Sequence, residues 1–255
     1  MKLTMRSKNK NKIKFNKTYI SPNFEDKSNR DIIFVIIHYT GMKPLKKTLE
    51  KFKNPSSKVS CHWVISEGGN FFKIVEEKNI AWHCGISSWK NFIGLNKFSI
   101  GIELDNSGHG NNYKGFSKNQ MSSLAILLRN ILKKYNINYK NVLAHSDIAP
   151  ERKADPGEFF DWNYLAKKNL AFYPEVKKPL EKEEFILQLG DYSSKILAIK
   201  KLLNEIGYKT ELNNKYDLKF KLVVEAFQRR FLPIVVNGII SNQLYQRILQ
   251  VHKKS

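Results

Sequence analysis

Cysteine and long apolar stretches are both scarce in this chain. Two cysteines among 255 residues exclude a small fold held together by disulfide bonds. The longest uninterrupted apolar run is Ile32–Ile37, far shorter than the ~20 residues that a membrane-spanning helix needs. The sequence also has no internal repeat. Because 42% of the residues are hydrophobic, the chain can still build a core, and its length suits one or two domains.

Acidic residues are absent from the start of the chain, and the first is Glu25. The basic residues that precede it are Lys2, Arg6, Lys8, Lys10, Lys12, Lys14 and Lys17. Such a block is typical of a solvated arm, and no apolar segment of ~7–15 residues follows it as a signal peptide would require. We therefore expect a basic, mostly irregular arm over residues 1–30 and no standard export signal.

Positive charge also dominates the whole chain. Its 44 lysines and arginines exceed its 23 acidic residues, which gives a net charge of +21. This excess invites a nucleic-acid-binding interpretation. The lysines are spread widely, however, and no zinc-finger spacing or RNA-recognition signature is present. We therefore expect no nucleic-acid partner.

Strand and helix patterns alternate between residues 31 and 173. The β-branched run Ile32–Ile37 predicts an interior strand that is buried on both faces. Further strands are predicted at Cys61–Ser66 and Phe71–Val75, which form a hairpin, and at Ser99–Leu104 and Val142–Ala144. Helices are predicted at Pro44–Lys53, after the N-cap Ser117, and at Trp162–Phe172. The pattern indicates an α/β fold.

The composition changes after residue 173. Residues 174–184 contain prolines and many charges, which is typical of a linker. Residues 185–255 show three apolar helical faces, and the first ends at Gly207. We expect a catalytic domain over residues 31–173 and a small three-helix domain over residues 185–255.

Two of the six histidines follow predicted strands directly. His38 ends the first buried strand and His145 ends Val142–Ala144, and ligands in α/β sheets gather at such carboxyl ends. The loop after His145 can return Asp155 to its side. Two imidazoles and one carboxylate fit a catalytic zinc with one position left for water. Asp147 can replace Asp155 in this set, and Asp155 can also merely start a turn.

A rival zinc site combines Cys61 and His62 with His83 and Cys84. Adjacent residues on a strand point to opposite faces, and this spacing differs from that of structural zinc sites. The alternative interpretation is that both cysteines are buried and inert.

Glu103 shares one strand face with Gly101 and Asp105. A carboxylate beside a glycine on an apolar strand fits a general base. The same pattern also fits a surface glutamate on an edge strand.

Four segments in order resemble the type 2 N-acetylmuramoyl-L-alanine amidases, over about residues 30–172. These segments are His38–Thr40, Ala81–Gly85, Ile100–Glu103, and His145–Pro150 continued by Arg152–Gly157. Members of that family are zinc enzymes that remove the stem peptide from muramic acid in peptidoglycan. The resemblance implies a mixed central sheet flanked by helices, one zinc ion, and peptidoglycan or a muropeptide as substrate.

The resemblance also implies a role for each matching residue. By this resemblance, the zinc ligands of the chain are His38, His145 and Asp155. Glu103 matches the catalytic carboxylate, and Lys153 matches a basic residue that faces the developing oxyanion. Trp82 and His83 match a segment that borders the substrate groove. Cys84 stands where the family usually has a smaller residue.

The tail is similar to a three-helix peptidoglycan-binding domain in Ile196–Tyr208, Val224–Phe231 and Asn237–Ile240. Leu203 replaces a glutamine typical of that family, so a module that only packs is the alternative. A wall-binding tail favours the cell envelope, or secretion by a route without a recognisable signal peptide. The missing export signal favours the cytoplasm. A non-catalytic peptidoglycan-binding protein is the alternative function, although such relatives typically lose a zinc ligand and this chain retains all three.

Overall fold

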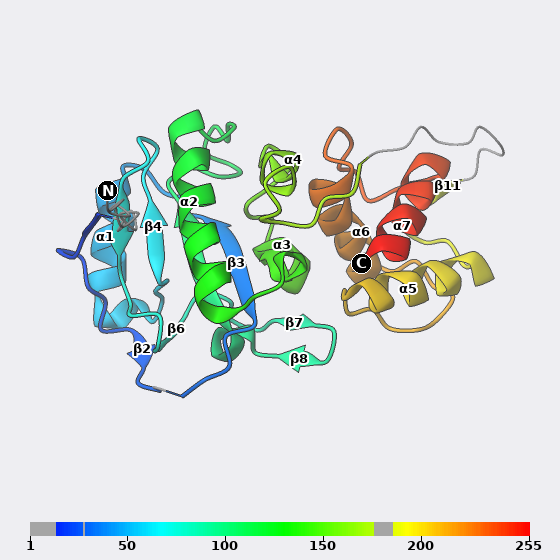
Figure 1. The fold of residues 1–255 in the computed structure, drawn as a ribbon. Coiled ribbons are helices and arrows are strands. Elements are labelled where there is room, and N and C mark those ends of the chain that lie inside the picture. The colour runs from blue at the N-terminus through cyan, green and yellow to red at the C-terminus, as the bar shows by residue number, and fades with distance from the viewer. Residues whose placement is uncertain (1–13, 28, 176–185) are drawn as a thin grey trace, which may run out of the picture.

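The computed structural model of the chain describes residues 14–27, 29–175 and 186–255 (Figure 1). The first 13 residues of the expected arm lie outside this description, as do residues 176–184 of the expected linker. Within the described part, no helix combines the length and apolar composition that crossing a lipid bilayer requires.

A mixed six-stranded sheet forms the centre of the molecule, as predicted. Its strand order is β1-β5-β4-β9-β3-β10. The strands are β1 (Phe15–Asn16), β3 (Phe34–Tyr39), β4 (Trp63–Ile65), β5 (Phe71–Lys73), β9 (Ser99–Leu104) and β10 (Val142–Ala144). Strands β4, β9, β3 and β10 are parallel, whereas β5 runs antiparallel to β4 in the predicted hairpin.

Three two-stranded sheets lie outside this centre. They pair β2 (Phe24–Glu25) with β6 (Ile80–Ala81), β7 (Ser88–Trp89) with β8 (Phe92–Ile93), and β11 (Ile186–Leu187) with β12 (Ile240–Ser241). Short 3₁₀ helices occupy η1 (Pro55–Ser57), η2 (Leu95–Phe98) and η3 (Tyr139–Asn141).

One face of the central sheet packs against α2 (Lys118–Tyr135). This helix begins where the Ser117 hydroxyl accepts the Gln120 N–H, so the predicted N-cap is confirmed. Alternate strand residues such as Val35 and Ile37 bury their side chains on this face with the apolar stripe of the helix.

The helix α4 (Trp162–Ala166) is shorter than the predicted span Trp162–Phe172. Asn169 adopts a left-handed conformation with φ of 56°, and the Leu170 N–H bonds back to Leu165. This turn ends the helix and still buries Leu170 in the core beside α2.

One helix near the start of the chain and the three tail helices cover different parts of the opposite face of the sheet. The helix α1 (Leu45–Lys53) buries Leu49 and Phe52 against Val64 of β4. The tail helices α5 (Ser194–Ile206), α6 (Leu218–Phe231) and α7 (Asn242–Lys254) lie at the other side of the molecule, as Figure 1 shows. A cleft lies at the carboxyl ends of β3 and β9, and α1 and residues 152–155 form part of its wall.

The tail shares its hydrophobic core with the sheet. Phe34, Ile36 and Leu143 of the sheet belong to the same buried cluster as Phe227 and Phe231 of α6. The short helix α3 (His145–Ile148), which follows β10, also contacts α6.

Residues 14–27 are more ordered than an irregular arm. Strand β1 adds to the sheet edge beside β5, and the Phe15 ring packs edge-on against Trp63 with centroids 5.3 Å apart. An aromatic contact of this kind offsets the conformational entropy that is lost when a short segment with a weak strand pattern becomes ordered.

Candidate metal centre and active site

Three chemically important side chains lie at one edge of the parallel strands. His38 and Glu103 are directly paired in the register of β3 and β9. His145 follows β10, the other neighbour of β3. Because parallel strands end at the same edge of a sheet, side chains from three distant segments meet there.

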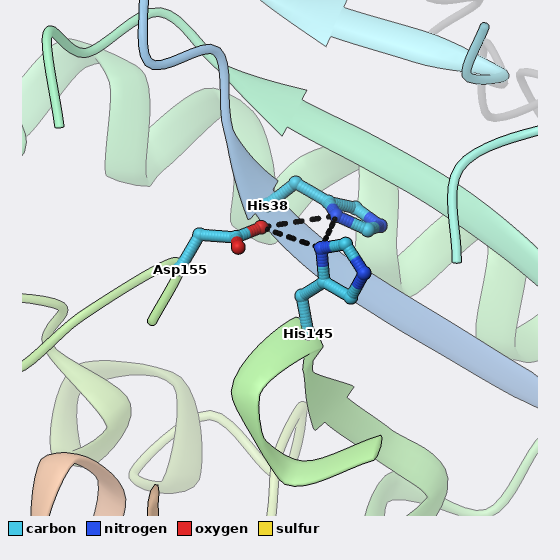
Figure 2. A group of neighbouring side chains, drawn as sticks. All are labelled: His38, His145 and Asp155. Carbon is cyan, nitrogen blue, oxygen red and sulfur yellow. Dashed lines mark hydrogen bonds and ion pairs between the residues drawn. The ribbon is translucent and has the colours of Figure 1, made fainter. Parts of the chain in front are cut away.

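His38, His145 and Asp155 converge on one point, as Figure 2 shows. The Nδ1 atoms of the two histidines are 2.9 Å apart, and Asp155 Oδ2 lies 3.1 Å from His38 Nδ1 and 2.9 Å from His145 Nδ1. Ligand atoms about 2.0–2.1 Å from a tetrahedral zinc are about 3.3 Å apart. The triangle is therefore close to the size that one ion requires.

The protonation states of this group suit a cation. Burial and the neighbouring His145 lower the pKa of His38 to about 4, so its imidazole is neutral near pH 7 and can act as a ligand. Burial alone would raise the pKa of Asp155, but the two imidazoles hold it well below its usual range. A carboxylate with two imidazole nitrogens is a typical donor set for catalytic zinc.

Glu103 borders the same cleft without joining the triangle. Its side chain is partly exposed, whereas its Oε2 atom is buried and has no hydrogen-bond partner among the described residues. Burial, and then the charge of Asp155, raise the pKa of Glu103 well above its usual value. A carboxyl group in this setting can exchange a proton with a bound molecule.

The cleft has a volume of about 420 Å³. Trp82, His83 and Lys153 line it, and so do Lys51 of α1 and Arg152. Arg152 donates to the carbonyl oxygens of Cys84 and Ile86. The wall is therefore basic, which favours an anionic ligand.

The alternative ligand Asp147 faces away from the triangle. Its carboxylate accepts hydrogen bonds from the Tyr208 hydroxyl and the Ala144 N–H, and it forms a buried ion pair with Arg230 of α6. Asp147 therefore connects the segment of His145 to the tail. No sequence motif marks this contact, since Arg230 lies 83 positions away.

The rival zinc site does not form. Cys61 and Cys84 are both completely buried, and the Cys61 thiol lies 3.3 Å from the Trp63 carbonyl oxygen. Within residues 14–27, 29–175 and 186–255, the His38, His145 and Asp155 set is the one group of at least three possible ligands that lies close enough to hold an ion. His83 lies under His38 instead, with 9% of its surface exposed.

Comparison with known proteins agrees with the geometry. The model of the N-acetylmuramoyl-L-alanine amidase family matches residues 28–158. The N-acetylmuramoyl-L-alanine amidase AmiD of Escherichia coli K12 is 30% identical over 220 residues, which cover 80% of this chain and 76% of that protein. The 1,6-anhydro-N-acetylmuramyl-L-alanine amidase AmpD of Haemophilus influenzae is 33% identical over 57% of this chain and 88% of its own length.

A solved structure extends the likeness into the tail. The complex of Escherichia coli AmiD with anhydro-N-acetylmuramic acid-L-Ala-D-gamma-Glu-L-Lys superposes with a TM-score of 0.73 and 26% identity. It covers 94% of this chain and 92% of the AmiD chain. The arrangement of sheet and tail helices therefore recurs in a relative.

Proposed function

The chain belongs to the N-acetylmuramoyl-L-alanine amidase family, and from this premise we propose that it hydrolyses the amide bond between N-acetylmuramic acid and the L-alanine of the stem peptide. The convergence of His38, His145 and Asp155 beside Glu103 carries the proposal. A binding protein without activity does not need a buried carboxyl group next to such a donor set.

We propose that these three residues hold one zinc ion. The two Nδ1 atoms and the Asp155 carboxylate match its ligand preference, and among the described residues no fourth histidine, cysteine or carboxylate joins this group. Bound zinc would supply the activation of a water molecule and the polarisation of the amide carbonyl.

Glu103 acts as the proton carrier in this proposal. The carboxylate takes a proton from the attacking water and later delivers it to the leaving amine of L-alanine. Its raised pKa makes the carboxylate a stronger base for the first of these two transfers.

Lys153 places a positive charge at the cleft, where the carbonyl oxygen becomes negative. Trp82 lines the same cleft and is proposed to contact the substrate. The basic wall attracts the free carboxylates of the stem peptide. We propose anhydro-muropeptides as substrates, because the printed names and the ligand of the relatives point to this class.

Mass spectrometry of the products tests the proposal. We would incubate the zinc-loaded chain, and as a control its Glu103→Gln variant, with an anhydro-muropeptide and separately with intact sacculi. The expected products are an intact stem peptide that begins with L-alanine and a sugar with a free lactyl carboxylate. Absence of this cleavage on both substrates would refute the function. Cleavage of sacculi would favour the cell envelope as compartment, and cleavage of the soluble compound alone would favour the cytoplasm.

A further inference from the structure

Each histidine of the metal centre has a hydrogen-bond acceptor on its far side. His38 Nε2 lies 3.0 Å from His83 Nδ1, and His145 Nε2 lies 3.1 Å from the carbonyl oxygen of Cys84. A histidine that binds metal through Nδ1 carries its proton on Nε2 and needs such an acceptor to fix its ring. Both acceptors come from two consecutive residues.

The hydrogen bonds around His83 form a chain in which each group donates to the next, from His38 through His83 and Ser99 to the Leu95 carbonyl oxygen. His83 accepts the His38 proton at Nδ1, so its own proton is on Nε2, which lies 3.3 Å from the Ser99 hydroxyl. Ser99 in turn donates to the Leu95 carbonyl at 2.6 Å.

The position of His83 is fixed from two sides. Asn96 Oδ1 accepts the backbone N–H groups of both His83 and Cys84, at 3.0 and 2.7 Å. The His83 ring lies directly over Gly101 of β9, where an added Cβ atom would be 2.5 Å from the ring. Only glycine leaves this space, so the strand that carries Glu103 also holds the His83 ring in place.

We propose that His83 is a positioning residue that orients His38 for metal binding, with Ser99 as its own support. This inference rests on the proposed zinc site, and it differs from the substrate contact that the sequence resemblance implies for His83. Loss of an acceptor of this kind typically costs about 10–100-fold in metal affinity.

Zinc affinity, measured by competition with a chromophoric chelator, tests the inference. His83→Ala should raise the zinc dissociation constant about 10–100-fold. His83→Asn should restore part of the loss, because its Oδ1 can take the place of Nδ1 as acceptor. Ser99→Ala changes the volume little and should weaken zinc binding less than His83→Ala does, which keeps the test informative if that variant does not fold.

His62→Ala is the matched control. His62 is completely buried, with its ring centroid 5.6 Å from that of His83, but it bonds the Gly101 N–H and the Asn79 carbonyl rather than a metal ligand. The melting temperature of the His62→Ala variant should fall, while its zinc affinity should stay within about 2-fold of that of the unmodified chain.

Two outcomes separate the two proposals. Zinc bound as tightly by His83→Ala and Ser99→Ala as by the unmodified chain would overturn the role of His83 and leave the amidase proposal intact. Failure of the unmodified chain to bind zinc would overturn the proposed metal centre and this inference with it.

Discussion

Glu103 moves protons in the proposed reaction and does not hold the metal. Its Oε2 has no hydrogen-bond partner among the described residues, so Glu103→Gln should leave the metal triangle unchanged. We expect kcat to fall by about 10²–10⁴ while about one zinc per chain remains bound. Steady-state kinetics together with metal analysis check this expectation. A variant that lost its zinc would instead identify Glu103 as a ligand.

Lys153 is an exposed cation at the cleft, and its proposed role concerns the transition state. Lys153→Ala should lower kcat by about 10²–10³ with little change in KM, the effect of losing one oxyanion stabiliser. Lys51→Ala is the comparison, because Lys51 lines the same cleft from α1 and should affect mainly KM. An unchanged kcat in Lys153→Ala would exclude the role.

The meeting of His38 and His145 was predictable from the sequence because strand ends and polar residues coincide at both positions, whereas the choice of Asp155 over Asp147 needed the resemblance to a known family. The geometry of parallel strands then brings these positions together. The partner of His38 was not predictable, because His83 reaches it from a loop whose path depends on Asn96 and on the missing side chain of Gly101. A motif shows which residues are present and not which ring nitrogen each one faces.

The end of α2 is attached to the sheet through Glu77. The carboxylate of Glu77 accepts hydrogen bonds from Trp63 of β4 at 2.9 Å and from Lys134 and Tyr135 of α2 at 2.6 and 2.8 Å. Burial works to raise the pKa of Glu77, but these donors outweigh it and hold the pKa below its usual value. The ionised form therefore stabilises the folded state.

This attachment gives a pH-dependent prediction. Because the folded pKa is lower than the unfolded value of about 4.3, the contribution of Glu77 is complete above that value and is lost as the pH falls through the folded pKa. Glu77→Gln should lower the free energy of unfolding by about 1–3 kcal/mol at pH 7, and the difference should shrink below about pH 4. Urea titrations at both pH values measure it. Glu76→Gln, which changes an exposed neighbour paired with Lys73, should have little effect at either pH.

At the scale of elements, helices and strands whose apolar pattern repeats over many residues were predicted well, and short segments were not. The strand at Ser99–Leu104 and the helix after Ser117 occur as predicted, because their apolar residues repeat over many positions. The helix at Trp162 ends early and Phe15–Asn16 joins the sheet, because a single turn or one aromatic contact decides each case. Such contacts depend on tertiary packing.

The whole molecule is held together by an interface between the sheet and the tail. The Arg230 guanidinium pairs with Asp147, bonds the carbonyl oxygens of Val142 and Phe172, and lies 4.2 Å from the centroid of the Trp162 ring. Gly207 also fits under Trp89, where an added Cβ atom would be 2.3 Å from the ring. We therefore propose that residues 185–255 support the catalytic part as well as forming a helical domain.

Truncation after Tyr173 distinguishes support from tethering. Removal of the tail would expose Phe34, Ile36 and Leu143 and leave Asp147 without its cation. We expect a lower melting temperature and a loss of activity that is equal on a soluble muropeptide and on sacculi. A truncated chain that kept its melting temperature and its activity on the soluble compound, and lost only the activity on sacculi, would instead indicate a tether.

Arg230→Met tests the same interface while keeping the tail. Removing one partner of a buried ion pair typically costs about 3–5 kcal/mol, because the other charge stays buried without compensation. Denaturant unfolding of Arg230→Met, of Asp147→Asn and of the double variant measures the coupling free energy between the two side chains. If the two effects simply add, the ion pair does not connect the two parts.

The contact between Arg230 and Asp147 also limits how the tail of this protein can be exchanged for another binding domain. A catalytic unit and a binding unit that are joined by a linker can be separated by a cut in that linker, and the binding unit can then be exchanged. Here the proline-bearing segment 174–184 looks like a natural place for such a cut, yet the donated module would also have to supply an arginine and a tyrosine at the positions of Arg230 and Tyr208. A successful chimera should therefore keep the native tail and attach the new binding unit beyond residue 255.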